Sequence, residues 1–159
     1  MVTTRIDPRD LVLAIVHFNE QKVEGRTLLQ KQAYFINEKL KLGVAFEPHY
    51  YGPYSEAIAL ATKSLVAIDF LVEAEESFAP TLDDAFERKK YTYSLTAAGE
   101  TVFQELENQQ SQLVGSIKKV VEDITSKEEC DYKCLSRAAK MFHILKSQLV
   151  ISSGFFFIA

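Results

Sequence analysis

The sequence predicts a mainly α-helical α+β fold, in which three short helices precede a β-hairpin and further helices follow it. Two observations carry this prediction. Apolar residues recur at helical spacing in three segments before residue 70, and two short runs after it have the composition and alternation of strands. A chain of 159 residues with 47% hydrophobic content is long enough to bury one core, so we expect one compact body.

Capping signals delimit the first two helices. Asp7-Pro8 is typical of an N-cap followed by proline at the first helical position, and this helix is expected to end near Asn19. The second helix is expected to start at Thr27, because Thr27 and Gln30 have the spacing of a capping box. Gly43 would supply the left-handed residue that ends it.

A third helix and a hairpin complete the first part of the chain. Ser55 is expected to cap this helix, which carries apolar residues at helical spacing: Ile58, Ala61, Leu65 and Ile68. The hairpin strands are expected at residues 70–73 and 90–95, joined by a long acidic loop. Three helices followed by a two-stranded wing is the winged-helix order, so residues 1–99 are predicted to form a winged-helix-like domain.

The second part of the chain is predicted to be helical. Thr96 is expected to cap a long helix with a heptad seam at Phe103, Leu106, Gln110, Leu113, Ile117, Val120 and Ile124. This seam either packs on the core of its own chain or pairs with a second subunit as a homodimer, and Gln110 would fix the register in the second case. Residues 100–159 would thus form a helical extension, packed on the first domain or mediating dimerisation.

A final helix is expected from Tyr132 to about Leu149. Its apolar residues share one face: Leu135, Ala138, Phe142, Leu145 and Leu149. The chain then closes on an apolar run that includes three consecutive phenylalanines. This run is expected to pack as a strand or to dock on a partner, unless the sequence stops early.

Composition and motif content exclude several classes of function. The chain has 18 basic and 22 acidic residues, which argues against sequence-independent attraction to nucleic acid or anionic lipid. Only two cysteines are present, Cys130 and Cys134, and no signal segment or membrane-length apolar run is found, so we expect a cytoplasmic protein without membrane attachment. The three histidines are scattered and no catalytic motif occurs, so neither an enzyme nor a metal or other cofactor is expected.

The aromatic loop, defined here as Phe46 to Ser55, is the strongest candidate for a functional surface. Its ten residues include five aromatic rings, counting His49, together with two prolines and a glycine. Two interpretations of its tyrosines stay open. They clamp the second helix to the third, or they form a contact patch for a protein partner. The candidate partner-binding residues are His49, Tyr50, Tyr51 and Tyr54.

Duplex DNA is the other candidate partner. The side chains that could contact its phosphates lie beside the second helix, on the third helix and at the wing: Arg26, Lys31, Lys63, Arg88, Lys89 and Lys90. The third helix is poorly suited to base recognition, because Lys63 is its only basic residue and its N-terminal turn begins with Glu56. Solvated surface charge is the simpler explanation of these cations.

Three motifs stand out along the chain: Gly25-Arg26-Thr27-Leu28-Leu29-Gln30-Lys31 followed by Tyr34-Phe35, then the aromatic loop, then Tyr93-Ser94-Leu95-Thr96-Ala97-Ala98-Gly99. Together they resemble the YwgA-like proteins of bacteria and archaea. They are more distantly similar to the Panacea antitoxin domain, which shares a Leu-Gln-Lys helix and a Tyr-Gly-Pro turn. The resemblance extends from about residue 8 to residue 146.

This resemblance implies a winged-helix-type regulator or accessory protein, and the Panacea relatives imply antitoxins that neutralise a partner. It transfers no catalytic residue. We therefore predict a non-enzymatic winged-helix-type regulatory protein, for which a DNA-binding transcriptional regulator is the first candidate role. The alternative is a protein-binding module, antitoxin-like or defence-associated, that uses the aromatic loop.

Overall fold

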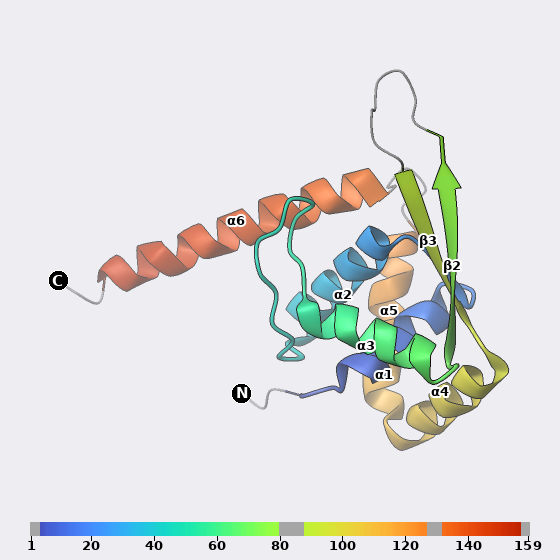
Figure 1. Ribbon diagram of the computed structural model, residues 1–159. Coiled ribbons are helices and arrows are strands. Elements are labelled where there is room, and N and C mark those ends of the chain that lie inside the picture. The colour runs from blue at the N-terminus through green and yellow to red at the C-terminus, as the bar shows by residue number, and fades with distance from the viewer. Residues whose placement is uncertain (1–3, 80–87, 127–131, 157–159) are drawn as a thin grey trace.

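Helices form the body of the protein in the computed structural model, which describes residues 4–79, 88–126 and 132–156, and a small sheet lies along one edge of this body (Figure 1). The first half of the chain contains α1 (Pro8–Phe18), β1 (Lys22–Glu24), α2 (Arg26–Leu40) and α3 (Glu56–Ala67). The second half contains β2 (Leu71–Phe78), β3 (Arg88–Leu95), α4 (Ala97–Gln109), α5 (Ser111–Thr125) and α6 (Tyr132–Phe156). The mainly helical α+β class predicted from the sequence is therefore confirmed.

The sheet has three antiparallel strands in the order β1-β3-β2. The central strand β3 pairs with β1 through Val23 and Tyr93, and with β2 from Leu71 opposite Leu95 to Phe78 opposite Arg88. Both hairpin strands are longer than predicted, and Glu75 lies on β2 rather than in a loop. Strand β1 was not predicted, because a three-residue strand with one apolar residue carries no alternation of its own.

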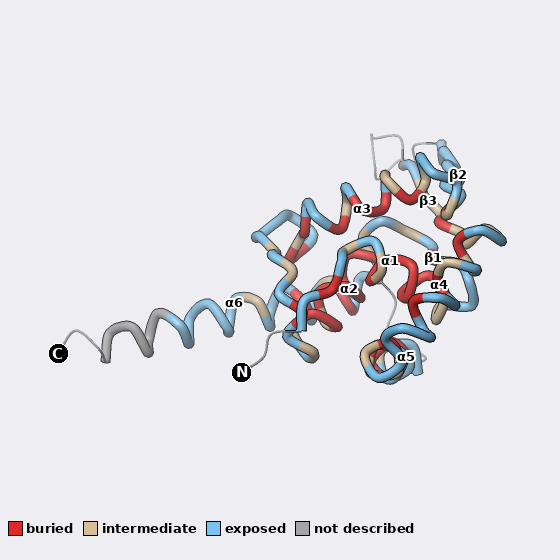
Figure 2. Tube along the Cα trace, turned by 90° about the horizontal axis from the view of Figure 1, so that it is seen from below, coloured by how far each residue is buried: buried red, intermediate tan, exposed pale blue. Residues whose placement is uncertain are grey.

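Helix α1 forms the centre of the core. It begins as predicted, with Pro8 as its first residue and the Asp7 carboxylate accepting a hydrogen bond from the Arg9 amide at 2.9 Å. Its residues from Leu11 to Val16 are all buried, which requires packing partners on every side of the helix (Figure 2). Those partners include α3, α5, α4 and α2.

Helix α2 begins and ends differently from the prediction. Gly25 precedes it with a φ of 117° and no side chain caps it, so the Thr27–Gln30 capping box is wrong. The helix closes on Lys41, whose φ of 54° is left-handed, rather than on Gly43. The Asn37 side chain exchanges two hydrogen bonds with the backbone of Val44, which fixes the chain just after this turn.

Helix α3 and the start of α4 follow the predicted caps. The Ser55 hydroxyl accepts from the Ile58 amide at 3.4 Å, and the Thr96 hydroxyl accepts from the Gly99 amide at 3.0 Å. Ile68, expected in the core, is instead the C-cap of α3 and is half exposed.

The prediction of one long heptad helix is wrong, because the helix is interrupted at Gln110, which has φ −131° and ψ 45° and separates α4 from α5. Helices α4 and α5 pack against each other and against α1. The seam residues consequently contribute to the core of their own chain: Phe103, Leu106, Ile117 and Val120 are buried, Leu113 and Ile124 are partly buried, and Gln110 is exposed. This seam is therefore not a free face for a second subunit.

Helix α6 continues past the predicted end at Leu149. Its contacts with α2 continue as far as Lys146, and the helix then extends away from the body of the protein (Figure 1). Among the described residues, no helix combines the length and apolar character required to cross a membrane.

A close backbone contact explains the glycine of the Thr-x-x-Gly motif. The Thr96 hydroxyl donates to the carbonyl oxygen of Asp69 at 2.7 Å and accepts from Gly99, which draws the first turn of α4 against the end of α3. A Cβ atom on Gly99 would lie 2.1 Å from the carbonyl oxygen of Phe70. Only glycine fits here without displacing the backbone.

We expect Gly99→Ala to lower the free energy of unfolding by about 3 kcal/mol, because backbone rather than a mobile side chain blocks the added methyl group. Gly115→Ala is the matched control. Gly115 is also helical and has no atom within 4 Å of an added Cβ, so this change should stabilise by about 0.5–1 kcal/mol. Urea unfolding followed by circular dichroism measures both, and equal effects would contradict the explanation.

Candidate interaction site

The aromatic loop is a closed turn between α2 and α3. Glu47 and Tyr54 form an antiparallel bridge, in which each amide donates to the other's carbonyl oxygen at 2.8 and 2.9 Å. The Gly52 amide donates to the His49 carbonyl oxygen at 2.9 Å, and Gly52 has a φ of 95°. These hydrogen bonds give residues 47–54 a defined shape.

Two buried polar side chains of α2 anchor the base of this loop. The Gln30 amide group donates to the carbonyl oxygen of Ser55 and accepts from its amide, both at 2.9 Å. Lys31 Nζ donates to the carbonyl oxygen of Pro53 at 2.6 Å. Gln30 and Lys31, which belong to the first sequence motif, therefore hold the last residues of the aromatic loop, which is the second motif.

Lys31 is thus not the surface cation that the sequence predicted. Its exposed fraction is 2%, and burial lowers the pKa of its ammonium group to about 8. A phosphate cannot reach Nζ without unpacking the loop. This burial argues against the predicted role of Lys31 as a nucleic-acid contact.

The two interpretations of the tyrosines apply to different rings. Tyr50 and Tyr51 face outward, with exposed fractions of 79% and 56%, and their rings make an edge-to-face contact at 4.9 Å. Tyr54 is partly buried and its ring lies 5.1 Å from that of the exposed His49. Tyr54 therefore belongs to the base of the loop, whereas Tyr50 and Tyr51 are available to a partner.

The tip of the loop lies against the first half of α6. A Cβ atom on Gly52 would be 3.3 Å from the carbonyl oxygen of Ser136 and 3.6 Å from Lys140 Cβ. Loop and helix consequently form one continuous surface.

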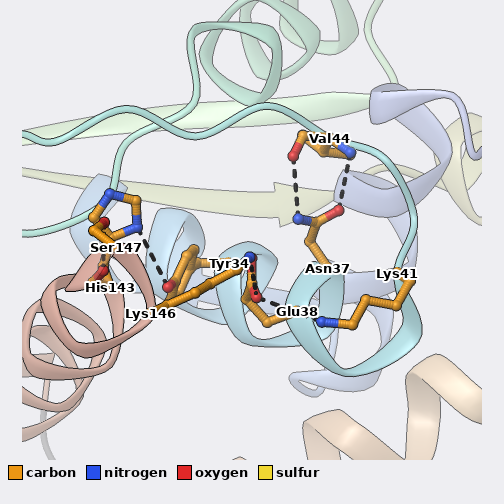
Figure 3. A network of polar contacts seen from close by, with 8 residues as sticks. All are labelled: Tyr34, Asn37, Glu38, Lys41, Val44, His143, Lys146 and Ser147. Carbon is orange, nitrogen blue, oxygen red and sulfur yellow. Dashed lines mark hydrogen bonds and ion pairs between the residues drawn. The ribbon is translucent and has the colours of Figure 1, made fainter. Parts of the chain in front are cut away.

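Polar contacts with α2 hold α6 in place (Figure 3). Lys146 Nζ lies 2.7 and 2.9 Å from the two carboxylate oxygens of Glu38, whose side chain is only 12% exposed. Tyr34 Oη lies 3.5 Å from His143 Nδ1. Burial, aided by the charge of Glu38, raises the pKa of the Tyr34 hydroxyl to about 12.

The apolar face predicted for the last helix is only partly buried. Leu135 is 7% exposed, but the large apolar side chains that follow on α6 are about half exposed or more: Met141, Phe142, Ile144, Leu145, Leu149 and Val150. The sequence pattern does not predict this exposure, because an apolar helix face that points to solvent has the same period as one that packs on the core.

Acidic neighbours pair with two of the predicted DNA contacts, both on the wing. Lys89 and Lys90 form ion pairs with Glu75 at 2.8 Å and with Glu24 at 2.5 Å. Hydrogen bonds from Lys90 and then Lys22 lower the pKa of Glu24 to about 2. In the described part of the wing, Lys89 and Lys90 are therefore already paired with carboxylates.

Two further predicted DNA contacts, Arg26 and Lys63, lie on α2 and α3. The Arg26 guanidinium lies 3.4 Å from the centroid of the Tyr91 ring and donates to Tyr93 Oη at 3.1 Å. Together with Lys63, which is exposed on α3, it lines a pocket of about 140 Å³. The side chain of Arg88 lies outside the described part of the chain.

Nothing in the described residues groups three or more His, Cys, Asp or Glu side chains in a way that could hold a metal ion. His17 stacks on Phe103 at 3.9 Å and is hydrogen-bonded to Glu100 at 2.9 Å, so its role is structural. Cys134 is disulfide-bonded, and the cysteines therefore do not support the reducing compartment expected from the sequence. Cys130 lies outside the described residues.

Neither a scan against protein-family models nor a search of curated proteins finds a match for this chain. The YwgA-like resemblance therefore stays a prediction. Its motifs are physically connected in the fold, because Gln30 and Lys31 bind the end of the aromatic loop and Arg26 donates to Tyr93 Oη.

The buried ammonium group of Lys31 predicts a specific pH dependence. Its pKa is lower in the folded protein than its ordinary value of 10.5, so the unfolded chain binds more protons between about pH 8 and pH 10.5. The free energy of unfolding should therefore rise with pH in this range. The pKa values of Tyr34 and Tyr93 are both raised to about 12 in the folded protein. They lower the free energy of unfolding as the pH rises, but only above about pH 10.

We expect Lys31→Met to remove this rise between pH 8 and pH 10, and Lys63→Met, at an exposed lysine, to retain it. Urea unfolding of the three proteins at matched ionic strength measures the slopes. Parallel curves for the natural protein and Lys31→Met would show that Lys31 titrates normally.

Proposed function

We propose that this chain is a non-enzymatic regulatory protein that binds a protein partner through the aromatic loop. The observation that carries the proposal is the outward pair Tyr50 and Tyr51 on a loop whose base is anchored. The element order α1-β1-α2-α3-β2-β3 and the sheet order β1-β3-β2 support a winged-helix-like scaffold for this loop.

The anchored base favours binding energetically. Tyrosine rings supply large contact areas with few rotatable bonds, and a preformed loop loses little further entropy when a partner covers it. The bonds from Gln30 and Lys31 lie beneath the loop, so they do not compete with a partner for Tyr50 and Tyr51. Exposed aromatic pairs on a structured loop are typical of binding hot spots.

The family resemblance supports the same class of function. The Panacea-like features imply a protein that neutralises a partner, and the aromatic loop contains the Tyr-Gly-Pro turn that carries part of that resemblance. An antitoxin-like or defence-associated accessory role is thus the form of partner binding that we propose.

The DNA-binding alternative has less support from the charges. Helix α3 begins with Glu56 and exposes Leu60 beside Lys63, which offers few donors to base edges. Lys89 and Lys90 are paired with carboxylates, and a phosphate would have to displace those partners.

We expect Tyr50→Ala/Tyr51→Ala to weaken partner binding at least about 30-fold, because alanine removes both exposed rings. Tagged protein captured from a lysate of the source organism and analysed by quantitative mass spectrometry provides the measurement. Leu60→Ala, at an exposed apolar residue on α3, is the control and should retain the partner. All three proteins should unfold within about 0.5 kcal/mol of one another, since these side chains are largely exposed. Equal capture of the same proteins by all three would refute the proposal.

Random duplex DNA tests the alternative directly. We expect no measurable affinity at low salt, since Lys89 and Lys90 are already paired with carboxylates. Fluorescence anisotropy across a salt series measures this, and an affinity that falls linearly with the logarithm of salt concentration would restore the DNA interpretation.

A further inference from the structure

We propose that two copies of this chain associate through helix α6. The contact is the apolar stripe, defined as Ala138, Phe142, Leu145 and Leu149, paired with the same stripe of a second copy. These residues follow steps of four, three and four, the spacing that lets one helix pack along another. Phe142, Leu145 and Leu149 are 45%, 55% and 70% exposed, so the stripe is largely uncovered in the single chain.

The stripe and the body use adjoining sides of α6, and Phe142 lies at their boundary, with its ring 6.3 Å from that of Tyr34 in an edge-to-face arrangement. Ala139 is fully buried against the body, and successive helical residues differ by about 100° in direction, so Ala138, Leu145 and Leu149 lie about a quarter turn round the helix from that contact. Glu38 and Tyr34 hold the helix at Lys146 and His143. The stripe therefore lies on a helix that is already formed and extends from the body (Figures 1 and 2).

The charges beside the stripe favour a second copy over an oppositely charged partner. When Phe142 and Leu145 occupy the two apolar positions of a heptad on α6, four residues flank the stripe: Ala139, Met141, Lys146 and Gln148. Lys146 is the one charged residue among these four, and Glu38 of the same chain neutralises it. Flanking charges of one sign would repel an identical helix, and the described flanks carry no such pattern.

The other cations of α6 do not oppose this contact. Lys133, Arg137 and Lys140 are exposed and lie on the side of the helix remote from the centre of the stripe. Two copies could therefore approach without bringing these charges together.

Side-chain size favours an antiparallel arrangement. With a two-fold axis between His143 and Ile144, Phe142 faces Leu145 of the second copy and Ala138 faces Leu149. Each small residue then lies opposite a large one, and each contact occurs twice, as two-fold symmetry requires. The two bodies, attached to the first half of each helix, lie at opposite ends of the pair.

The stripe is short, so we expect a weak and reversible dimer. A few half-exposed side chains from each copy bury on the order of 1,000 Å² in total, near the lower limit for a specific interface. A dissociation constant on the order of 10 μM to 100 μM is consistent with that area.

Sedimentation velocity of the full chain tests the association. Over a series reaching about 500 μM, the average mass should rise from 18.0 kDa toward twice that value. Leu145→Lys should keep the protein monomeric, because a lysine would lie at the centre of the seam. Ile144→Lys is the matched control, since Ile144 is adjacent, similar in size and 48% exposed but lies off the stripe, and it should dimerise like the natural protein.

Circular dichroism establishes that both variants are folded, which is expected because both side chains are about half exposed. A natural chain that stays monomeric throughout would overturn the proposal. Equal loss or equal retention of dimer in Leu145→Lys and Ile144→Lys would also overturn it.

The orientation has its own test. Ala138→Glu and Leu149→Lys should each weaken the dimer, because each places an unpaired charge in the seam. An equimolar mixture should restore association when the helices are antiparallel, since the two new charges then face each other. A mixture no stronger than either variant alone would overturn the antiparallel arrangement.

Discussion

The contact between α2 and the segment from Pro53 to Ser55 is the constraint on which the candidate site depends. Gln30 and Lys31 place buried polar groups against backbone carbonyl and amide groups of this segment, so the base of the aromatic loop and the start of α3 are fixed together. A buried lysine without its hydrogen bond is costly, and the Pro53 carbonyl offsets that cost at 2.6 Å. The loop is thus determined largely by α2.

The position of α6 follows from the same anchoring. The loop tip at Gly52 and the side chains of Tyr34 and Glu38 together form the surface on which the first half of α6 rests. Only one side of the helix is used by this contact. Its other sides carry large apolar residues that the chain itself leaves exposed, which is an unusual arrangement for a fold with an extensive core.

Local signals in the sequence predicted α1, α3 and the start of α4, because Asp7, Ser55 and Thr96 cap helices through atoms only two or three residues away. Features that depend on distant partners were not predictable in this way. Strand β1 exists because β3 pairs with it, and Gln30 leaves its expected capping role because Ser55 binds its side chain. The break at Gln110 depends on the packing of α4 and α5 around α1. For the site, the sequence located the aromatic loop but not the direction of its rings.

Lysines illustrate why a charge count says little about function. Lys31, Lys89 and Lys90 all appeared to be surface cations in the sequence, yet one is buried under the loop and two are paired with carboxylates. The basic residues of helix α6 are a different case, because they share the helix with an apolar stripe that is largely exposed. If that stripe joins two copies, each dimer presents two aromatic loops, since the loop contacts α6 at Ser136 and Lys140 rather than at the stripe. A partner with two matching sites would then bind more tightly than one loop permits, because its second contact forms within the complex.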